Sequence, residues 1–125
     1  MHDARAQFSK YYKTLNEAQK KAVDTIEGPV MVVAGPGTGK THILTLRIAN
    51  ILQSTDTPPD GVLALTFTEA GVDAMKQRLL KMIGPTAYKV GIYTFHGFCN
   101  DVIHSHPEYF PRIISSIALT DIESI

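Results

Sequence analysis

The sequence predicts a three-layer α/β fold with a parallel sheet. Short apolar runs, which are typical of strands buried on both faces, alternate with segments whose apolar residues recur at helical spacing. A glycine-rich turn at residues 34–41 directly follows the first apolar run and precedes a predicted helix. This alternation favours parallel strands with helices packed against the sheet. In such a fold a ligand sits at the carboxyl ends of the strands, so we expect the functional residues there.

Three predicted segments precede the glycine-rich turn. Residues 1–13 are polar and mixed, and they predict a short helix or a loose end. Residues 15–23 predict a helix, for which Asn16 is the expected cap. Residues 30–34 are continuously apolar and predict a short buried strand that leads into the turn.

The remaining elements alternate after the turn. They are a helix over 39–52, a strand over 62–67, a helix over 69–83, a strand over 90–95 and a helix over 97–105. Gly84 followed by Pro85 ends the helix over 69–83, because Gly suits a helix C-cap and Pro cannot continue a helix. The apolar stripe expected on the helix over 39–52 consists of Leu44, Ile48, Ile51 and Leu52. The stripe expected on the helix over 69–83 consists of Val72, Met75, Leu79, Met82 and Ile83.

The end of the chain predicts a further part of the protein. Residues 117–119 fit a fourth strand, and residues 120–123 read as a capping box that opens a new helix. The chain stops two residues later, so we expect a piece of a longer protein. The expected parts are an N-terminal extension (1–14), an incomplete domain (15–116) and the start of a connection to a missing helical subdomain (117–125).

Composition sets broad limits on function. Of the 125 residues, 44% are hydrophobic and 19% are charged, as is ordinary for a globular domain. Twelve basic residues balance twelve acidic ones, so the net charge gives no sign of a nucleic-acid partner, although a basic patch can be local. The single cysteine, Cys99, excludes an intrachain disulfide and fits a reducing cytoplasm. No apolar run approaches the roughly 20 residues that a membrane span needs, so we expect a cytoplasmic protein without membrane contact.

The glycine-rich turn reads Ala-Gly-Pro-Gly-Thr-Gly-Lys-Thr and has the composition of a phosphate-binding loop. Glycine lets the backbone curl tightly, so that successive N–H groups can point at phosphate oxygens. The N-terminus of the following helix adds partial positive charge. Ala34 stands where the strict pattern has Gly, which is a mild departure. The alternative is a glycine-rich turn that holds no ligand.

The predicted ligand of this loop is a nucleoside triphosphate with Mg²⁺. Lys40 would reach the β and γ phosphates and the Thr41 hydroxyl would ligate Mg²⁺, which makes these two the expected catalytic residues. The expected loop contacts to the cofactor are those of Ala34, Gly35, Pro36, Gly37, Thr38, Gly39, Lys40 and Thr41.

Four stretches of the sequence together carry a family resemblance. Residues 15–23 resemble the Q motif, 34–41 motif I, 65–75 motif Ia and 93–99 motif Ib of superfamily 1 DNA helicases of the UvrD/Rep/PcrA kind. The resemblance implies an incomplete RecA-like P-loop NTPase domain from an ATP-dependent DNA helicase that moves 3′ to 5′ along single-stranded DNA. The implied partners are single-stranded DNA, junctions between single-stranded and double-stranded DNA, and the missing remainder of the helicase chain.

The resemblance also implies two residues that contact the adenine base. Gln19 would read adenine with its carboxamide, which offers both a donor and an acceptor, and the alternative is a solvated surface glutamine. The residue after Thr41 is usually Arg in this family and packs on the adenine ring. Here it is His42, whose ring stacks more weakly and carries a pH-dependent charge. The alternative is a histidine that merely faces solvent.

DNA contacts are implied at the ends of the predicted second and third strands. The residues are Thr66, Phe67, Thr68, Thr94, Phe95, His96 and Gly97. Aromatic rings can stack on bases and hydroxyls can bind phosphates, and Gly97 would allow a DNA strand to approach closely. The alternatives are a core position for Phe67 and a structural hydrogen bond for His96.

Groups that hydrolysis needs are missing from the sequence. Phosphoryl transfer uses an acidic residue that holds Mg²⁺, a group that orients the attacking water and an arginine for the transition-state charge. The chain has no adjacent Asp-Glu pair, and Arg112 is its only arginine beyond residue 78. We therefore expect this piece to bind nucleotide weakly and to hydrolyse none. Alternatives that stay open are the helicase portion of a RecB- or AddA-like nuclease, a P-loop small-molecule kinase and a nucleotide-binding module without turnover.

Overall fold

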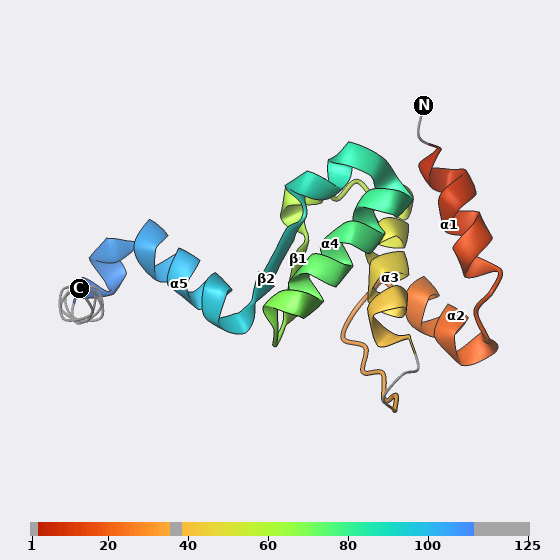
Figure 1. Cartoon of the computed structure of the whole chain (residues 1–125), viewed down its shortest axis with the longest axis horizontal. Helices are drawn as coiled ribbons and strands as arrows, with labels where there is room; N and C mark the ends of the chain where they lie inside the picture. The colour runs from red at the N-terminus through yellow and green to blue at the C-terminus, as the bar shows by residue number, and fades with distance from the viewer. Residues whose placement is uncertain (1–2, 36–38, 112–125) are drawn as a thin grey trace.

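The computed structural model describes residues 3–35 and 39–111, and Figure 1 shows the arrangement of its elements. The α-helices are α1 (Ala4–Tyr12), α2 (Glu17–Asp24), α3 (Lys40–Ser54), α4 (Glu69–Ile83) and α5 (Phe95–Ser105). The strands are β1 (Leu63–Thr66) and β2 (Gly91–Thr94). Short 3₁₀ helices are η1 (Pro59–Gly61), η2 (Gly84–Lys89) and η3 (Pro107–Tyr109).

The sheet within the described residues is a parallel pair. β1 and β2 run side by side in a register that pairs Leu63 with Gly91 and Thr66 with Thr94, and α4 connects them. This pairing confirms the predicted α/β class and the parallel sheet. The carboxyl ends of both strands meet at one edge, and Figure 1 shows the N-terminal ends of α3, α4 and α5 at that same end of the molecule.

Side-chain caps fix where four of the helices begin. Asp3, Asn16, Thr68 and Thr94 each accept a hydrogen bond from a backbone N–H of the first turn of α1, α2, α4 and α5. Such caps satisfy N–H groups that have no partner within the helix. The predicted Asn16 cap is confirmed, and so is the Gly84 C-cap of α4, whose φ of 74° suits glycine.

Two apolar clusters form the core, and α3 contributes to both. The first cluster joins α2 and α3 through Ala22, Val23, Ile43, Leu46 and Ala49, with Leu15 from the α1–α2 loop and Met82 from α4. The α1 side chains Phe8, Tyr11 and Tyr12 pack against it half-buried. The second joins α3 to α4 and β2 through Ile48, Val72, Met75, Leu79, Ala87, Val90 and Ile92. The stripe predicted for α4 is therefore confirmed, because four of its members are buried and Ile83 packs beside them. α5 has no buried residue and extends away from this body (Figure 1).

The strand predicted at residues 30–34 is wrong. This segment has no regular secondary structure, and Met31 and Val33 are 88% and 87% exposed. A strand needs a neighbouring strand that pairs its backbone groups and elements that cover its apolar faces. In the described part of the chain, the sheet consists of β1 and β2 alone, and neither pairs with this segment.

The apolar stripe predicted for α3 is partly wrong. Leu44 is 44% exposed, Ile51 and Leu52 are half-buried, and only Ile48 of the four is buried. The buried residues of α3 are Ile43, Thr45, Leu46, Ile48 and Ala49. The difference arises because α1 and α2 pack on one side of α3 and α4 on another, which buries a broad arc instead of one narrow stripe.

The predictions for the end of the chain lie outside the described residues. These are the strand at 117–119, the capping box at 120–123 and the connection from residue 117. Within the described residues, the longest helices fall short of the length and apolar character that a membrane crossing requires.

Gly71 provides a test of how the start of α4 is built. A Cβ at this position would lie 2.5 Å from Thr66 Oγ1 and 3.1 Å from the capping Thr68 Oγ1. We therefore expect Gly71→Ala to lower the free energy of unfolding by about 1–3 kcal/mol, although Ala is the better helix former. Urea unfolding measures this change.

Gly61→Ala is the matched control, because its added Cβ would meet neighbouring carbons only at the ordinary contact distance of 3.4 Å. We expect a change within about 0.5 kcal/mol for this variant. Equal effects of the two substitutions, or a more stable Gly71→Ala, would contradict the role given to Gly71.

Candidate functional site

The start of α3 differs from the starts of the other four α-helices. Its N-cap is Gly39, which adopts a left-handed conformation with φ 78° and has no side chain to cap the helix. The first backbone bond within the helix runs from the Ile43 N–H to the Gly39 carbonyl at 3.0 Å. The preceding N–H groups, up to that of His42, therefore have no intrahelical acceptor, and the helix dipole makes this end favourable for an anion.

Lys40 and Thr41 lie in this first turn. The Lys40 side chain is exposed, and Thr41 is half-buried. The Thr41 carbonyl accepts a hydrogen bond of 2.6 Å from Thr45 Oγ1, whereas the Thr41 hydroxyl has no hydrogen bond within the described residues. This hydroxyl fits the predicted Mg²⁺ ligand, although Mg²⁺ at such sites takes most of its ligands from carboxylates, water and substrate phosphates.

The loop before α3 is described only in part. Ala34, Gly35 and Gly39 are described, but Pro36, Gly37 and Thr38 are not, so the path of the loop around a phosphate stays a prediction. A hollow of about 210 Å³ lies beside this junction, and its lining includes Val30, Val32 and Lys40.

Gln19 has a structural role that the sequence analysis missed. Its Oε1 accepts a hydrogen bond of 2.9 Å from the Asn16 N–H, and its own N–H donates to Asn16 Oδ1 at 2.9 Å. This capping box holds the Gln19 side chain in one orientation, half-buried, so it is not simply a solvated surface glutamine. The spacing Asn-x-x-Gln in the sequence is typical of such a capping box and could have predicted it. The Gln19 Nε2 group has no hydrogen bond within the described part of the chain, so it can still donate to a base.

His42 packs against α1 instead of facing solvent. Its ring meets the Tyr11 ring edge-on, with centroids 5.4 Å apart and an interplanar angle of 79°. Burial lowers the pKa of His42 below its usual value of 6.5, and the nearby positive charge of Arg78 lowers it further. The ring is therefore mainly neutral at pH 7. A neutral ring can stack on a base but lacks the positive charge of the arginine that is usual at this position.

The predicted DNA-contact residues gather at the carboxyl edge of the sheet. Thr66 and Thr94 end the two strands opposite each other in the register. The rings of Phe67 and Phe95 follow directly, with centroids 5.0 Å apart, and Phe67 is 87% exposed. The alternative of a core position for Phe67 is therefore wrong, and the two rings form an exposed aromatic pair.

Both helices that leave this edge begin with the same Thr-x-x-Gly pattern. Thr68 Oγ1 accepts from the Gly71 N–H at 3.0 Å, and Thr94 Oγ1 accepts from the Gly97 N–H at 2.9 Å. A Cβ on Gly97 would lie 2.9 Å from Thr94 Oγ1, which gives a reason for glycine other than the close approach of DNA. The two threonine hydroxyls keep a hydrogen that can be donated to a phosphate.

His96 is exposed near the start of α5, and it makes no hydrogen bond within the described residues. The structural hydrogen bond considered as the alternative for His96 is therefore not observed there. Its place in the first turn of α5 puts it beside Phe95 at the same edge of the sheet.

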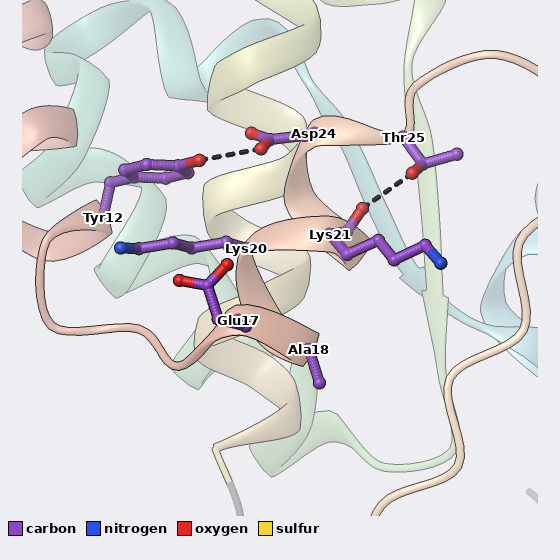
Figure 2. Close-up of a pocket in the computed structure, with 7 residues that line it drawn as sticks. All are labelled: Tyr12, Glu17, Ala18, Lys20, Lys21, Asp24 and Thr25. Carbon is purple, nitrogen blue, oxygen red and sulfur yellow. Dashed lines mark hydrogen bonds between the residues drawn. The ribbon is translucent and has the colours of Figure 1, made fainter.

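A further hollow, of about 540 Å³, lies over α2 and contains none of the predicted site residues (Figure 2). At its rim the Tyr12 hydroxyl donates a hydrogen bond of 2.7 Å to Asp24 Oδ2, which raises the pKa of Tyr12. The Lys20 ammonium lies 5.6 Å from the centre of the Tyr12 ring. These contacts tie the end of α1 to α2, so we interpret this group as structural.

Comparison with known proteins places this arrangement in a family. A model of the UvrD/REP helicase N-terminal domain matches residues 15–124. The ATP-dependent DNA helicase PcrA of Staphylococcus aureus is 45% identical over 85 residues, which cover 68% of this chain and 12% of that protein. PcrA of Staphylococcus epidermidis is 42% identical over 87 residues, or 70% of this chain and 12% of that protein. The chain therefore spans about an eighth of these relatives, and it belongs to the UvrD/REP helicase N-terminal domain family.

Proposed function

We propose that the chain is the ATP-binding part of an ATP-dependent DNA helicase that moves 3′ to 5′ along single-stranded DNA. Lys40 and the loop of residues 34–41 bind the phosphates of ATP, and Thr41 ligates Mg²⁺. Gln19 and His42 contact adenine. The strand-end residues from Thr66 to Gly97 named above contact single-stranded DNA, including its junctions with duplex.

The observation that carries the proposal is the uncapped start of α3. In the first turns of α4 and α5 one N–H group donates to the hydroxyl of Thr68 or Thr94, whereas Gly39 offers no side-chain acceptor to the N–H groups of α3. A phosphate supplies such an acceptor, and Lys40 stands in the same turn to balance its charge. PcrA, which the chain resembles, is named an ATP-dependent DNA helicase.

The exposed pair of Phe67 and Phe95 supports the nucleic-acid part of the proposal. Exposed aromatic rings cost free energy in water, and bases stack on such rings without sequence preference. The pair follows the carboxyl ends of β1 and β2, and Figure 1 shows that α3 begins on the same side of the molecule as these strand ends. This arrangement supports the proposal because a helicase must couple nucleotide binding to DNA binding, and packed helices and strands can carry that coupling between the two sites.

The wider architecture is part of the same proposal. Residues 15–116 belong to a three-layer, RecA-like P-loop domain, with an extension before it and a connection that begins at residue 117. The remainder of the helicase supplies the missing catalytic groups, and the protein acts in the cytoplasm. Neither the family match nor the PcrA relatives favours a P-loop kinase or a RecB- or AddA-like nuclease.

Lys40→Ala tests the nucleotide site. We expect Mg²⁺-ATP binding to weaken about tenfold or more, because a hydrogen bond to a charged group contributes about 1.5–3 kcal/mol. Fluorescence anisotropy of a labelled ATP analogue measures the change. The matched control is Lys89→Ala, which removes an exposed lysine before the amino end of β2 and leaves binding unchanged. Equal losses in both variants would contradict the assignment.

Phe67→Ala tests the DNA edge. We expect binding of a labelled oligo-dT strand to weaken by about 1–3 kcal/mol, which is the stacking contribution of one aromatic ring. Tyr88→Ala serves as the control, because Tyr88 is also exposed but lies in η2, before β2 begins. The assignment fails if DNA binding is insensitive to Phe67, or if the Tyr88 variant loses as much.

The turnover of the 125-residue chain tests the expected lack of hydrolysis. We expect no ATP-dependent phosphate release above background, because the chain has no Asp-Glu pair to hold Mg²⁺ and orient water. A coupled phosphate assay with and without single-stranded DNA measures it. Sustained release that disappears in Lys40→Ala would show that the chain itself is catalytically complete.

A further inference from the structure

A basic hollow lies where α1, α3 and α4 meet, away from the exposed aromatic pair. It has a volume of about 270 Å³ and is lined by Tyr11 from α1, His42 from α3, and Arg78, Lys81 and Met82 from α4. Tyr11 and His42 are half-buried, and Met82 is buried at its base. The hollow therefore has a rigid floor and a rim of polar side chains.

The charges around this hollow are positive and unbalanced. Arg78 and Lys81 are one helical turn apart on α4 and project toward the same opening. No carboxylate lines the hollow, and within residues 3–35 and 39–111 neither cation forms an ion pair. Lys10, whose ammonium lies 5.9 Å from the centre of the Tyr11 ring, adds a third permanent positive charge nearby. A local basic site is thus present although the chain as a whole is neutral.

The wall formed by α1 is held in place by other contacts. Tyr11 meets the His42 ring edge-on, and the neighbouring Tyr12 donates to Asp24 of α2, as Figure 2 shows. Phe8 stacks on Tyr12 with ring centroids 5.5 Å apart. These contacts fix the Tyr11 side of the hollow before any ligand arrives, which lowers the ordering cost of binding.

We propose that this hollow is a second anion site, which binds a phosphate group. The Arg78 guanidinium can donate two parallel hydrogen bonds to phosphate oxygens, the Lys81 ammonium adds a mobile positive charge, and the Tyr11 hydroxyl can donate a further bond. The site requires neither the loop of residues 34–41 nor Lys40. It therefore stands or fails independently of the proposed nucleotide site, with which it shares only the His42 wall.

The phosphate group can come from a free anion or from a nucleic-acid backbone. Both sources offer the same oxygen acceptors to Arg78 and Lys81. They differ in size and in local charge density, since a backbone brings several phosphates toward Lys10 as well. Inorganic phosphate and an oligo-dT strand are therefore the two probes.

NMR spectroscopy of the isotope-labelled 125-residue chain tests the proposal. Sodium phosphate is titrated against sodium chloride of equal ionic strength, which removes the effect of screening. We expect the Arg78 Nε–H signal and the backbone amides of residues 78–82 to shift with phosphate and not with chloride. Arg78→Gln and Lys81→Gln should each weaken this binding about tenfold or more, and Arg78→Lys should weaken it less.

Lys76→Gln is the matched control, because it removes the same charge from an exposed position of the same helix that does not line the hollow. Lys40→Ala should leave the phosphate shifts in place, whereas loss of the shifts in this variant would assign the phosphate to the start of α3 and overturn the proposal. Equal responses to phosphate and chloride, or an equal effect of Lys76→Gln, would also overturn it.

The oligo-dT titration identifies the source. If the Arg78 signal saturates at a lower phosphate concentration with oligo-dT than with inorganic phosphate, the ligand is a nucleic-acid backbone. If oligo-dT causes no shift, the ligand is a free anion. Because Arg78 and Lys81 are exposed, the variants should keep the thermal midpoint of the parent chain, which circular dichroism checks.

Discussion

The backbone N–H groups at the starts of the helices are the constraint on which this structure depends. Each helix that follows a strand or loop leaves its first N–H groups without an acceptor inside the helix, and these groups must be satisfied from elsewhere. In α4 and α5 the hydroxyls of Thr68 and Thr94 each satisfy one of these N–H groups. It begins α3 with Gly39, which has no side chain to offer. The helix dipole makes that end favourable for an anion, which is where we propose that phosphate binds.

The parallel pairing of β1 and β2 decides where the helix starts after these strands lie. Parallel strands end at the same edge, so the residues that follow them meet in space although α4 separates them in sequence. Phe67 and Phe95 are the first residues after the two strands, and their rings come together there, outside the core. The same local pattern, Thr-x-x-Gly, then turns the chain into each helix. The topology thus brings Thr66, Phe67, Thr94 and Phe95 together at one edge of the sheet.

The sequence predicted the elements whose signals are local. The bounds of α4 were predicted to the residue, because its apolar residues recur at helical spacing and Gly84 with Pro85 follows Ile83. The strand predicted at residues 30–34 was wrong, because strand formation depends on a neighbouring strand that no local pattern reveals. The apolar stripe predicted for α3 was partly wrong for a similar reason, since the helices that pack on α3 decide which of its residues are buried.

The candidate sites show the same division between local and tertiary signals. Lys40 and Thr41 lie in the first turn of α3, as a local motif predicted, and Gln19 was named although its capping role was overlooked. The basic hollow of Arg78 and Lys81 was not predicted, because it exists only where three helices meet. No periodicity or motif in the sequence places Tyr11 beside His42.

Backbone amide NMR at the start of α3 tests the central claim most directly. On addition of Mg²⁺-ATP to the 125-residue chain, the amides of Lys40 and Thr41 should shift and exchange more slowly with solvent, since phosphate oxygens become their acceptors. The Gly71 amide, which Thr68 already caps, should not change. Unchanged Lys40 and Thr41 amides, with the largest shifts instead around Tyr12 and Asp24, would contradict the account.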